Sequence, residues 1–164
     1  MRKIYFRRRS AGKTDYKARL ALLKSNKPRL VIRKTNHYMV AQIIKSKEAQ
    51  DAVICSANSK DLLKYGWPFS LHSIPAAYLT GFLLSTKAKS KIKEAVLDIG
   101  LQRSTKGSRI YATLKGFIDG GISINYNADI LPTEERIKGK HIKDEADKIA
   151  QEQNKIKEKI KMEK

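Results

Sequence analysis

The feature that most restricts the fold is a set of three short runs: RLVIRK (29–34), YMVAQIIK (38–45) and AVICSAN (52–58). Each run is rich in β-branched residues, which favour strands. Only brief polar links separate the runs, and links of that length join antiparallel strands, because parallel strands need a crossover of a dozen or more residues. The runs therefore predict an antiparallel meander of three strands.

The first of these strands has two different faces. Side chains alternate along a strand, so Leu30 and Ile32 share one face while Arg29 and Arg33 share the other. We therefore expect a sheet with an apolar face that packs on a core and a basic face on the opposite side.

The next part of the chain predicts a crossover unit. The segment PAAYLTGFLLSTKA (75–88) is apolar nearly all round, which is typical of a helix buried against a sheet. EAVLDIG (94–100) lacks alternation, as a covered parallel strand does. A second helix is expected from about Ser108 to Gly120. The fold class is therefore α/β, with a mixed sheet of about four strands, three antiparallel and one parallel through the crossover helix, and with helices packed on it.

The two ends differ from this central part. Residues 1–13 hold six Lys or Arg and no usable periodicity, so we expect an extended basic arm that an anionic partner orders. A helix should follow from Thr14, as its N-cap, to about Ser25. Its stripe of Tyr16, Leu20 and Leu23 is expected to dock on the core. The α/β domain spans residues 14–131.

Residues 132–164 form a charged C-terminal extension that we expect to be helical. The extension carries a narrow stripe at helical spacing: Ile142, Ala146, Ile149, Gln153, Ile156 and Ile160. So thin a stripe suits contact with a neighbouring molecule, and such a helix gains most of its stability from packing. We expect it to be frayed unless bound.

Charge indicates the kind of partner. The chain has 35 Lys and Arg against 16 Asp and Glu, a formal net charge of +19, and residues 1–50 alone carry +13. This excess favours a polyanionic partner, with a merely solvated basic segment as the alternative. The basic part has no bulky apolar face for a membrane surface, and AAYLTGFLL (76–84) is half the length of a membrane span. We expect no membrane partner.

Cysteine usage and the start of the chain predict a cytoplasmic protein. Cys55 is the only cysteine, which excludes an internal disulfide and suits a reducing compartment. The arginine-rich start has no apolar segment of a secretory signal. Cys55 alternates with Val53 and Ala57 in the predicted strand, so we expect it to be a small buried side chain.

Gly12-Lys13-Thr14 has the ending of a nucleotide-binding phosphate loop. That loop requires a glycine five positions before its second glycine, where this chain has Arg7, and an apolar strand before it. A nest of backbone N–H groups also needs several glycines, because other residues resist positive φ angles. The sequence therefore favours phosphates of a nucleic acid over those of a small nucleotide.

Catalytic and metal-binding patterns are weak. His37, His72 and His141 are scattered, without a second ligand at metal spacing. Asp98 lies near the end of the predicted parallel strand, where catalytic carboxylates often occur, but no acidic or histidine partner is close in sequence. We expect no enzymatic activity, no cofactor, no metal and no small-molecule substrate.

Basic residues interleaved with aromatic ones point to RNA. Arginine matches phosphate geometry and aromatic rings stack on unpaired bases. The candidate RNA-binding residues are Arg2, Lys3, Arg7, Arg8, Arg9, Lys13, Tyr16, Lys17, Arg19, Arg33, Lys34, Asn36, His37 and Arg109. Composition does not separate RNA from DNA, so a DNA-binding chromatin protein stays open, as does an RNA-modifying enzyme that uses Asp98.

The chain resembles the archaeal and eukaryotic type of large-subunit ribosomal protein eighteen, a universal 5S rRNA-binding family. The blocks that carry the resemblance are RRRSAGKTDYKARLALLKSNKPRLVIRKTNHY, YGW, IPAAYLTGFLL, EAVLDIGL, GSRIYATLKGFIDGGI and ILPTEERIKGKHI, in family order over roughly residues 2–142. The match fades beyond His141, so it implies nothing about the tail.

The resemblance implies a structural role in the large ribosomal subunit. It implies an α/β domain whose basic N-terminal arm lies on 5S rRNA in the central protuberance, beside 23S-type rRNA, large-subunit ribosomal protein five and other proteins of that region. It also implies that the candidate residues from Arg7 to His37 contact RNA, with Arg109 as a weaker candidate, and that no catalysis belongs to the chain.

Overall fold

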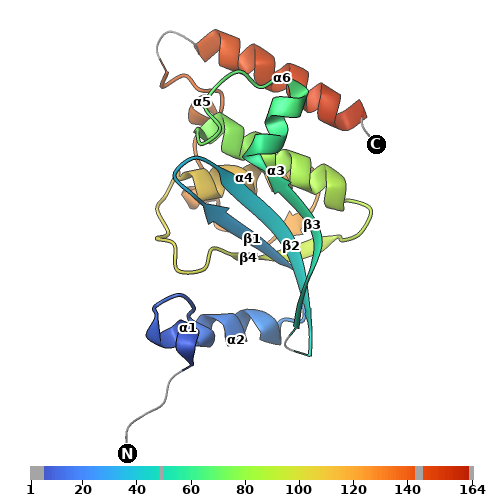
Figure 1. Cartoon of the computed structure of the whole chain (residues 1–164). Coiled ribbons are helices and arrows are strands. Elements are labelled where there is room, and N and C mark those ends of the chain that lie inside the picture. The colour runs from blue at the N-terminus through green and yellow to red at the C-terminus, as the bar shows by residue number, and fades with distance from the viewer. Residues whose placement is uncertain (1–5, 49, 143–145, 163–164) are drawn as a thin grey trace, which may run out of the picture.

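The computed structural model of the chain describes residues 6–48, 50–142 and 146–162. Its strands are β1 (Arg29–Lys34), β2 (Met39–Lys47), β3 (Gln50–Asn58), β4 (Glu94–Asp98) and β5 (Ser123–Ile124), and they form one sheet in the order β3-β2-β1-β4-β5. β1, β2 and β3 are antiparallel neighbours, whereas β4 runs parallel to both β1 and β5 (Figure 1). The predicted mixed α/β sheet is confirmed. β5 was not expected, because two residues are too few to show a pattern.

The meander contains a β-bulge that the sequence pattern did not predict. Ile43 pairs with Cys55 but Ile44 pairs with Val53, so Ile54 is an extra residue in β3. The bulge moves Val53 to the face opposite Ala57, and Val53 is 54% exposed while Ala57 is buried. The expected alternation of Val53, Cys55 and Ala57 on one face is therefore wrong.

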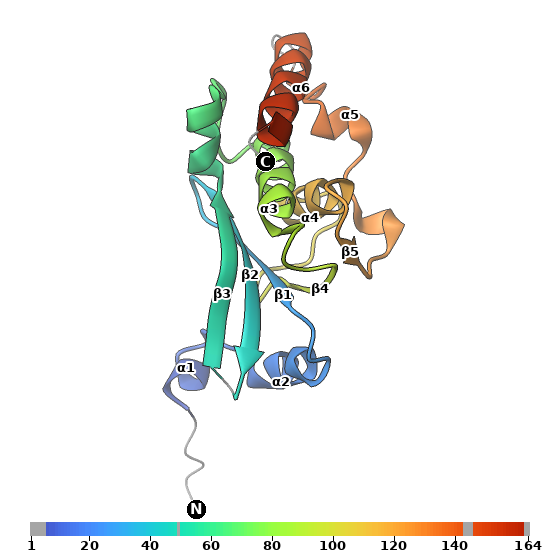
Figure 2. The ribbon, with the colours of Figure 1, turned by 90° about the vertical axis from the view of Figure 1, so that its right-hand side faces the viewer.

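Two helices cover one face of the sheet. They are α3 (Ile74–Ala88), which Ser73 caps, and α4 (Arg109–Asp119), and both lie on the same side of the sheet in Figure 2. Glycines allow the two backbones to touch: a Cβ on Gly81 would lie 1.9 Å from Thr113 O, and one on Gly116 would lie 2.0 Å from Tyr78 O. The crossover helix and the second helix are confirmed.

The C-terminal helix is part of the core. Short helical segments, η1 (Ser59–Tyr65), η2 (Ala128–Ile130) and α5 (Glu134–Ile137), connect the main elements, and α6 (Ala146–Met162) then packs on α3 and η1. Ile149, Ile156 and Ile160 are at most 1% exposed. The expected contact with a neighbouring molecule is corrected: α3 is apolar nearly all round, so after one side packs on α4 and the sheet, another side is left for α6 to cover.

The N-terminal segment is helical and lies against the body only loosely. α1 (Arg7–Ser10) is a single turn within what we expected to be an extended arm, and α2 (Tyr16–Lys24) follows it. No residue of α2 is fully buried, and Leu20 is 57% exposed. The expected docking of the Tyr16, Leu20 and Leu23 stripe on the core is therefore wrong, and polar contacts described below link α2 to the sheet instead.

Candidate nucleic-acid interface

Residues 6–24 form a compact basic unit of two helices. Gly12, with φ +62°, allows the chain to reverse between α1 and α2. Asp15 Oδ1 caps α2 by accepting hydrogen bonds of 2.9 and 3.1 Å from the backbone N–H groups of the second and third helical residues. We expected Thr14 to be the N-cap. Its Oγ1 instead accepts a 2.9 Å hydrogen bond from Arg8 Nε, because the charged Asp15 is the stronger acceptor at the positive end of the helix.

Exposed cations dominate this unit. Arg7, Arg8, Arg9, Lys13 and Lys17 all have exposed side chains. The sequence between residues 6 and 24 contains one acidic residue, and its carboxylate is the N-cap just described. Carboxylates of its own segment therefore leave most of the positive charge of this unit uncompensated.

Tyr16 stands within the basic unit beside a second ring. The ring centroids of Tyr16 and Phe6 are 5.1 Å apart, with a 38° angle between the ring planes. Phe6 is 71% exposed. Aromatic faces among cations offer stacking surfaces for unpaired bases.

A chain of alternating charges joins α2 to the sheet, and we call it the ion-pair ladder. Arg19 Nη2 lies 2.7 Å from Asp51 Oδ2, and Arg29 Nη2 lies 2.8 Å from Asp51 Oδ1. Arg29 Nη1 then lies 2.9 Å from Asp98 Oδ2, and Arg33 Nη2 lies 3.0 Å from Asp98 Oδ1. The ladder runs Arg19–Asp51–Arg29–Asp98–Arg33.

The ladder changes the expected character of the open sheet face. Arg29 is 4% exposed, so its guanidinium is a buried partner of two carboxylates rather than part of a basic surface. The Arg33 side chain is 40% exposed, and its Nη1 also donates to Asp98 O at 2.8 Å. Any RNA contact by Arg19 or Arg33 must therefore share the guanidinium with a protein carboxylate.

The position of Asp51 in the ladder lowers the pKa of its carboxyl group. Burial raises its pKa, but hydrogen bonds from Ser46 and Arg29 and the charges of Arg29 and Arg19 outweigh burial, so the pKa of Asp51 lies below its ordinary value. The carboxylate is therefore held in its charged form.

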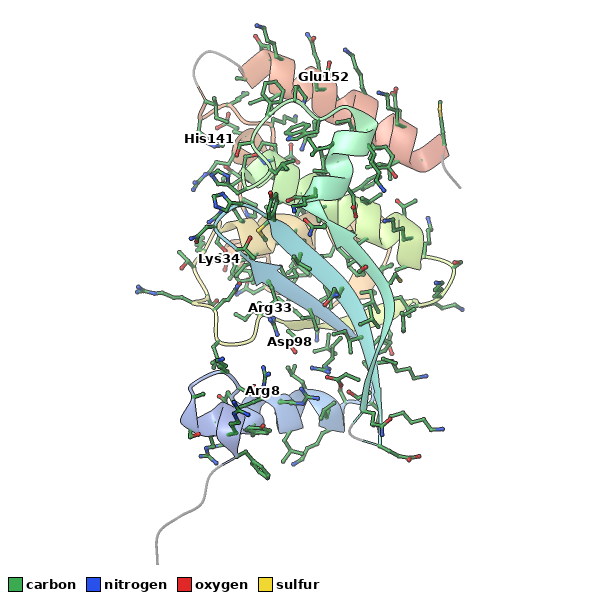
Figure 3. The ribbon with its side chains drawn as sticks, in the orientation of Figure 1. Arg8, Arg33, Lys34, Asp98, His141 and Glu152 are labelled. Atoms are coloured by element: carbon green, nitrogen blue, oxygen red, sulfur yellow. The ribbon has the colours of Figure 1, made fainter. Side chains whose placement is uncertain are left out.

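A cleft of about 560 Å³ lies between α2 and the open face of the sheet. Figure 3 shows Arg8 pointing from the arm toward the sheet, with Asp98 and Arg33 above it and Lys34 further along the same side. The charged residues that line the cleft are Arg8, Lys13, Asp15, Arg19, Arg29, Arg33, Asp51 and Asp98. Of the candidates, Arg8, Lys13, Arg19 and Arg33 thus meet at one cleft, whereas Arg7, Arg9, Tyr16, Lys17 and Lys34 do not line it.

The candidates that follow Arg33 lie at the end of β1 and in the turn to β2. Lys34, the last residue of β1, and Asn36 and His37 in the turn are exposed. The Lys34 backbone is fixed by Gln102, which donates to Lys34 O at 3.1 Å and accepts from Lys34 N at 3.3 Å. Lys60 lies 4.3 Å from the centroid of the Tyr38 ring beside this turn. The turn is a second group of exposed basic and aromatic residues.

Three candidates remain outside these two groups. Arg109, the first residue of α4, is half-buried and donates to His72 O at 3.0 Å. Arg2 and Lys3 lie outside the described residues.

Comparison with known proteins identifies the family of this chain. Residues 2–95 and 87–127 match the family model described as ribosomal large subunit proteins 60S L5, and 50S L18. The chain belongs to this ribosomal protein family. It is 54% identical to a protein named large ribosomal subunit protein uL18 from Korarchaeum cryptofilum, over 92% of this chain and 77% of the relative. Proteins of the same name from Methanococcus maripaludis (48% identity, 92% and 78%) and Methanoregula boonei (46%, 85% and 80%) also match. The resemblance stated from the sequence is confirmed.

The members of this family are ribosomal proteins rather than enzymes, and the surroundings of Asp98 agree with that. Both of its carboxylate oxygens accept hydrogen bonds, Oδ2 from Arg29, and Oδ1 from Arg33 and from the Gly100 backbone N–H at 2.9 Å. A carboxylate held in this way is a structural anchor for two cations.

Other reactive groups fit the same family picture. Burial raises the pKa of the half-buried Cys55 thiol despite the nearby charges of Lys91 and Lys87, which favours the unreactive thiol form. Among the described residues, no group of three or more His, Cys, Asp or Glu side chains is placed to hold a metal ion. No helix within the described ranges is long and apolar enough to cross a membrane.

The ladder is not evident from the sequence, in which Arg29 belongs to the basic face of a strand, Asp98 is a possible catalytic group and Asp51 does not stand out. Charged residues inside strands that are otherwise apolar are a usable signal, because a charge in such a place needs an opposite charge nearby.

Proposed function

We propose that this chain is a structural constituent of the large ribosomal subunit that binds 5S rRNA and helps to anchor it in the central protuberance. Residues 1–13 act as the RNA-binding arm, residues 14–131 as the α/β scaffold and residues 132–164 as a C-terminal extension. The partners in this proposal are 5S rRNA, 23S-type rRNA, and large-subunit ribosomal protein five with other proteins of the central protuberance.

The observation that carries the proposal is the basic unit of residues 6–24 in a chain of this family. Its exposed arginines and lysines face no carboxylate of their own segment except the N-cap Asp15. Its aromatic pair, the exposed Phe6 and the half-buried Tyr16, offers a surface for stacking. Cations that position a phosphate backbone, together with rings that contact bases, suit folded RNA.

The geometry of the site gives less support to the two alternatives, a DNA-binding chromatin protein and an RNA-modifying enzyme. A chromatin protein would use the same cations on duplex DNA, but the aromatic pair would have no unpaired base to contact. An RNA-modifying enzyme built on Asp98 would need a carboxylate available to substrate, and two arginines hold this one.

The test compares 5S rRNA with duplex DNA of equal length in competition for the full chain. With six to ten phosphate contacts, affinity for 5S rRNA should fall by about 10³- to 10⁵-fold between 50 and 200 mM salt.

Replacement of Arg7, Arg8 and Arg9 by alanine should weaken this binding and leave cooperative thermal unfolding intact, because none of the three side chains is buried.

The matched control removes three cations elsewhere, as R136A/K138A/K140A. These side chains are also exposed, and the control should bind 5S rRNA more tightly than the arm variant. Equal binding by both variants, or preference for duplex DNA, would refute the proposal.

A further inference from the structure

A second basic surface lies where the C-terminal ends of α3 and α6 meet. Figure 1 shows the two helices side by side with their C-terminal ends together, while α1 and α2 lie at the other end of the molecule. We call this surface the α3–α6 surface, and its residues are Lys64, Lys87, Lys89, Lys91, Lys159 and Lys161. All six side chains are exposed.

The surface is grooved. One hollow of about 560 Å³ is lined by Tyr65, Thr86, Lys87, Lys89 and Ser90 among others. A second hollow of about 280 Å³ adjoins it, shares Thr86 and Lys89 with it, and is also lined by Lys161. We call the two adjoining hollows the groove; besides lysines and hydroxyl groups, its walls include the apolar Phe82, Leu83 and Ile160 and the carboxylate of Asp119.

Half of these lysines are engaged by the protein itself. Lys159 Nζ donates to Tyr65 O at 3.1 Å, Lys91 Nζ donates to Ile54 O at 3.5 Å, and Lys87 Nζ lies 3.8 Å from Asp61 Oδ2.

The other half make no such contact. Within the part of the chain that the structure describes, the side chains of Lys64, Lys89 and Lys161 make no hydrogen bond or ion pair. The carboxylate at the groove, Asp119, accepts from Tyr78 at 2.8 Å and pairs with Lys115 at 3.0 Å. The groove therefore keeps a net positive charge.

Helix ends explain only part of this arrangement. The C-terminus of a helix favours a nearby cation, which accounts for the four lysines in the last turns of η1, α3 and α6: Lys64, Lys87, Lys159 and Lys161. Lys89 and Lys91 lie beyond the last turn of α3, in the link to β4, and add two further cations to the same surface. Like charges repel one another, so an anion bound beside the lysines that line the two hollows, Lys87, Lys89 and Lys161, would reduce their repulsion.

We propose that the α3–α6 surface binds the sugar-phosphate backbone of a second RNA segment while the N-terminal arm holds the first. Lysine and hydroxyl groups are the donors used on phosphate and ribose oxygens. The described surface carries no arginine, the residue that reads base edges in a bidentate way, so the contact is independent of RNA sequence. This inference rests on the proposed function for the identity of the first segment.

The experiment uses the full chain saturated with 5S rRNA, to which a fluorescein-labelled RNA duplex is added over a range of salt concentrations. The complex should bind the duplex with a salt-dependent affinity. The variant K89Q/K161Q should reduce the slope of log affinity against log salt by about 2, because each of the two lysines neutralises one phosphate. Neither side chain makes a hydrogen bond or ion pair in the described part of the chain, so thermal unfolding should not change.

The control K138Q/K140Q removes the same charge near α5 and should keep the wild-type slope. Equal slopes for the two variants would overturn the inference, as would a 5S-saturated complex that binds no duplex. Displacement of the duplex by polyglutamate at equal charge concentration would also overturn it, in favour of an acidic protein partner.

Failure of the proposed 5S rRNA binding can be distinguished from failure of the inference about the α3–α6 surface. If 5S rRNA does not bind, the same duplex titration on the free R7A/R8A/R9A chain still reports the α3–α6 surface, and K89Q/K161Q in that background should again lower the slope. An unchanged slope in that background would count against the surface itself.

Discussion

Arg29 is the residue on which the interface and the scaffold both depend. Its side chain is 4% exposed, and its two terminal nitrogens contact Asp51 and Asp98. Its Nε is buried and has no hydrogen-bond partner among the described residues. A buried guanidinium in this state needs its carboxylates, because removal of a partner leaves an uncompensated charge away from water. The ladder therefore stabilises the sheet and holds α2 through Asp51.

Replacement of Asp98 tests the structural role of the ladder. Asp98→Asn should lower the free energy of unfolding by about 3–5 kcal/mol, because both Arg29 and Arg33 lose their shared carboxylate. Urea denaturation measures this value. Glu94→Gln, which breaks the exposed Lys27–Glu94 pair, is the control and should cost at most about 1 kcal/mol. A loss for Asp98→Asn as small as that of the control would show that the ladder is not structural.

Asp51 gives stability a defined dependence on pH. Its folded pKa lies below its ordinary value of 3.8, despite the opposing effect of burial. A depressed carboxylate pKa contributes stability that is present above the unfolded pKa and lost as pH falls through the folded pKa. The difference in unfolding free energy between wild type and Asp51→Asn should therefore be constant above about pH 5 and shrink as the solution becomes more acidic. A difference that persists unchanged into strong acid would contradict this assignment.

At the scale of elements, the chain carries clear local signals for its sheet and its two central helices. The β-branched runs predicted the meander, and the all-round apolar pattern of α3 predicted the buried crossover helix, because these patterns report burial directly. The bulge at Ile54 and the short β5 depend on pairing between distant segments, so local pattern is silent about them. The loose packing of α2 has the same cause, since an apolar stripe does not say whether a surface is available to receive it.

The packing of α6 on α3 was not predicted from the sequence, and this packing has a testable consequence. Ile156 is completely buried in the core cluster with α3. Ile156→Ala should reduce the free energy of unfolding by about 2–5 kcal/mol, as for other large-to-small changes in cores. Lys155→Ala, an exposed neighbour on the same helix, should cost far less. Equal denaturation midpoints for the two variants would mean that α6 is frayed and outside the core.

At the scale of the whole molecule, charge and core are separated. The apolar core lies between the sheet, α3, α4 and α6, whereas the arm, the β1–β2 turn and the α3–α6 surface carry the exposed cations. The scaffold therefore packs without RNA, and the side chains of the basic surfaces contribute little to the buried core. The sequence predicted two parts of the candidate interface, the arm and the turn, because a run of basic residues can be recognised within a short stretch of sequence. It did not predict which arginines are tied to carboxylates, because Asp51 and Asp98 approach Arg29 and Arg33 only in the folded sheet.

The most direct test of the account is the identity of the RNA that copurifies with the full chain from cells at low salt, determined by sequencing. The account predicts 5S rRNA as the dominant species with the wild type, and its loss with R7A/R8A/R9A while R136A/K138A/K140A retains it. Recovery of duplex DNA, of a random mixture of RNA, or of equal amounts of 5S rRNA with both variants would contradict the claim that the N-terminal cations hold 5S rRNA.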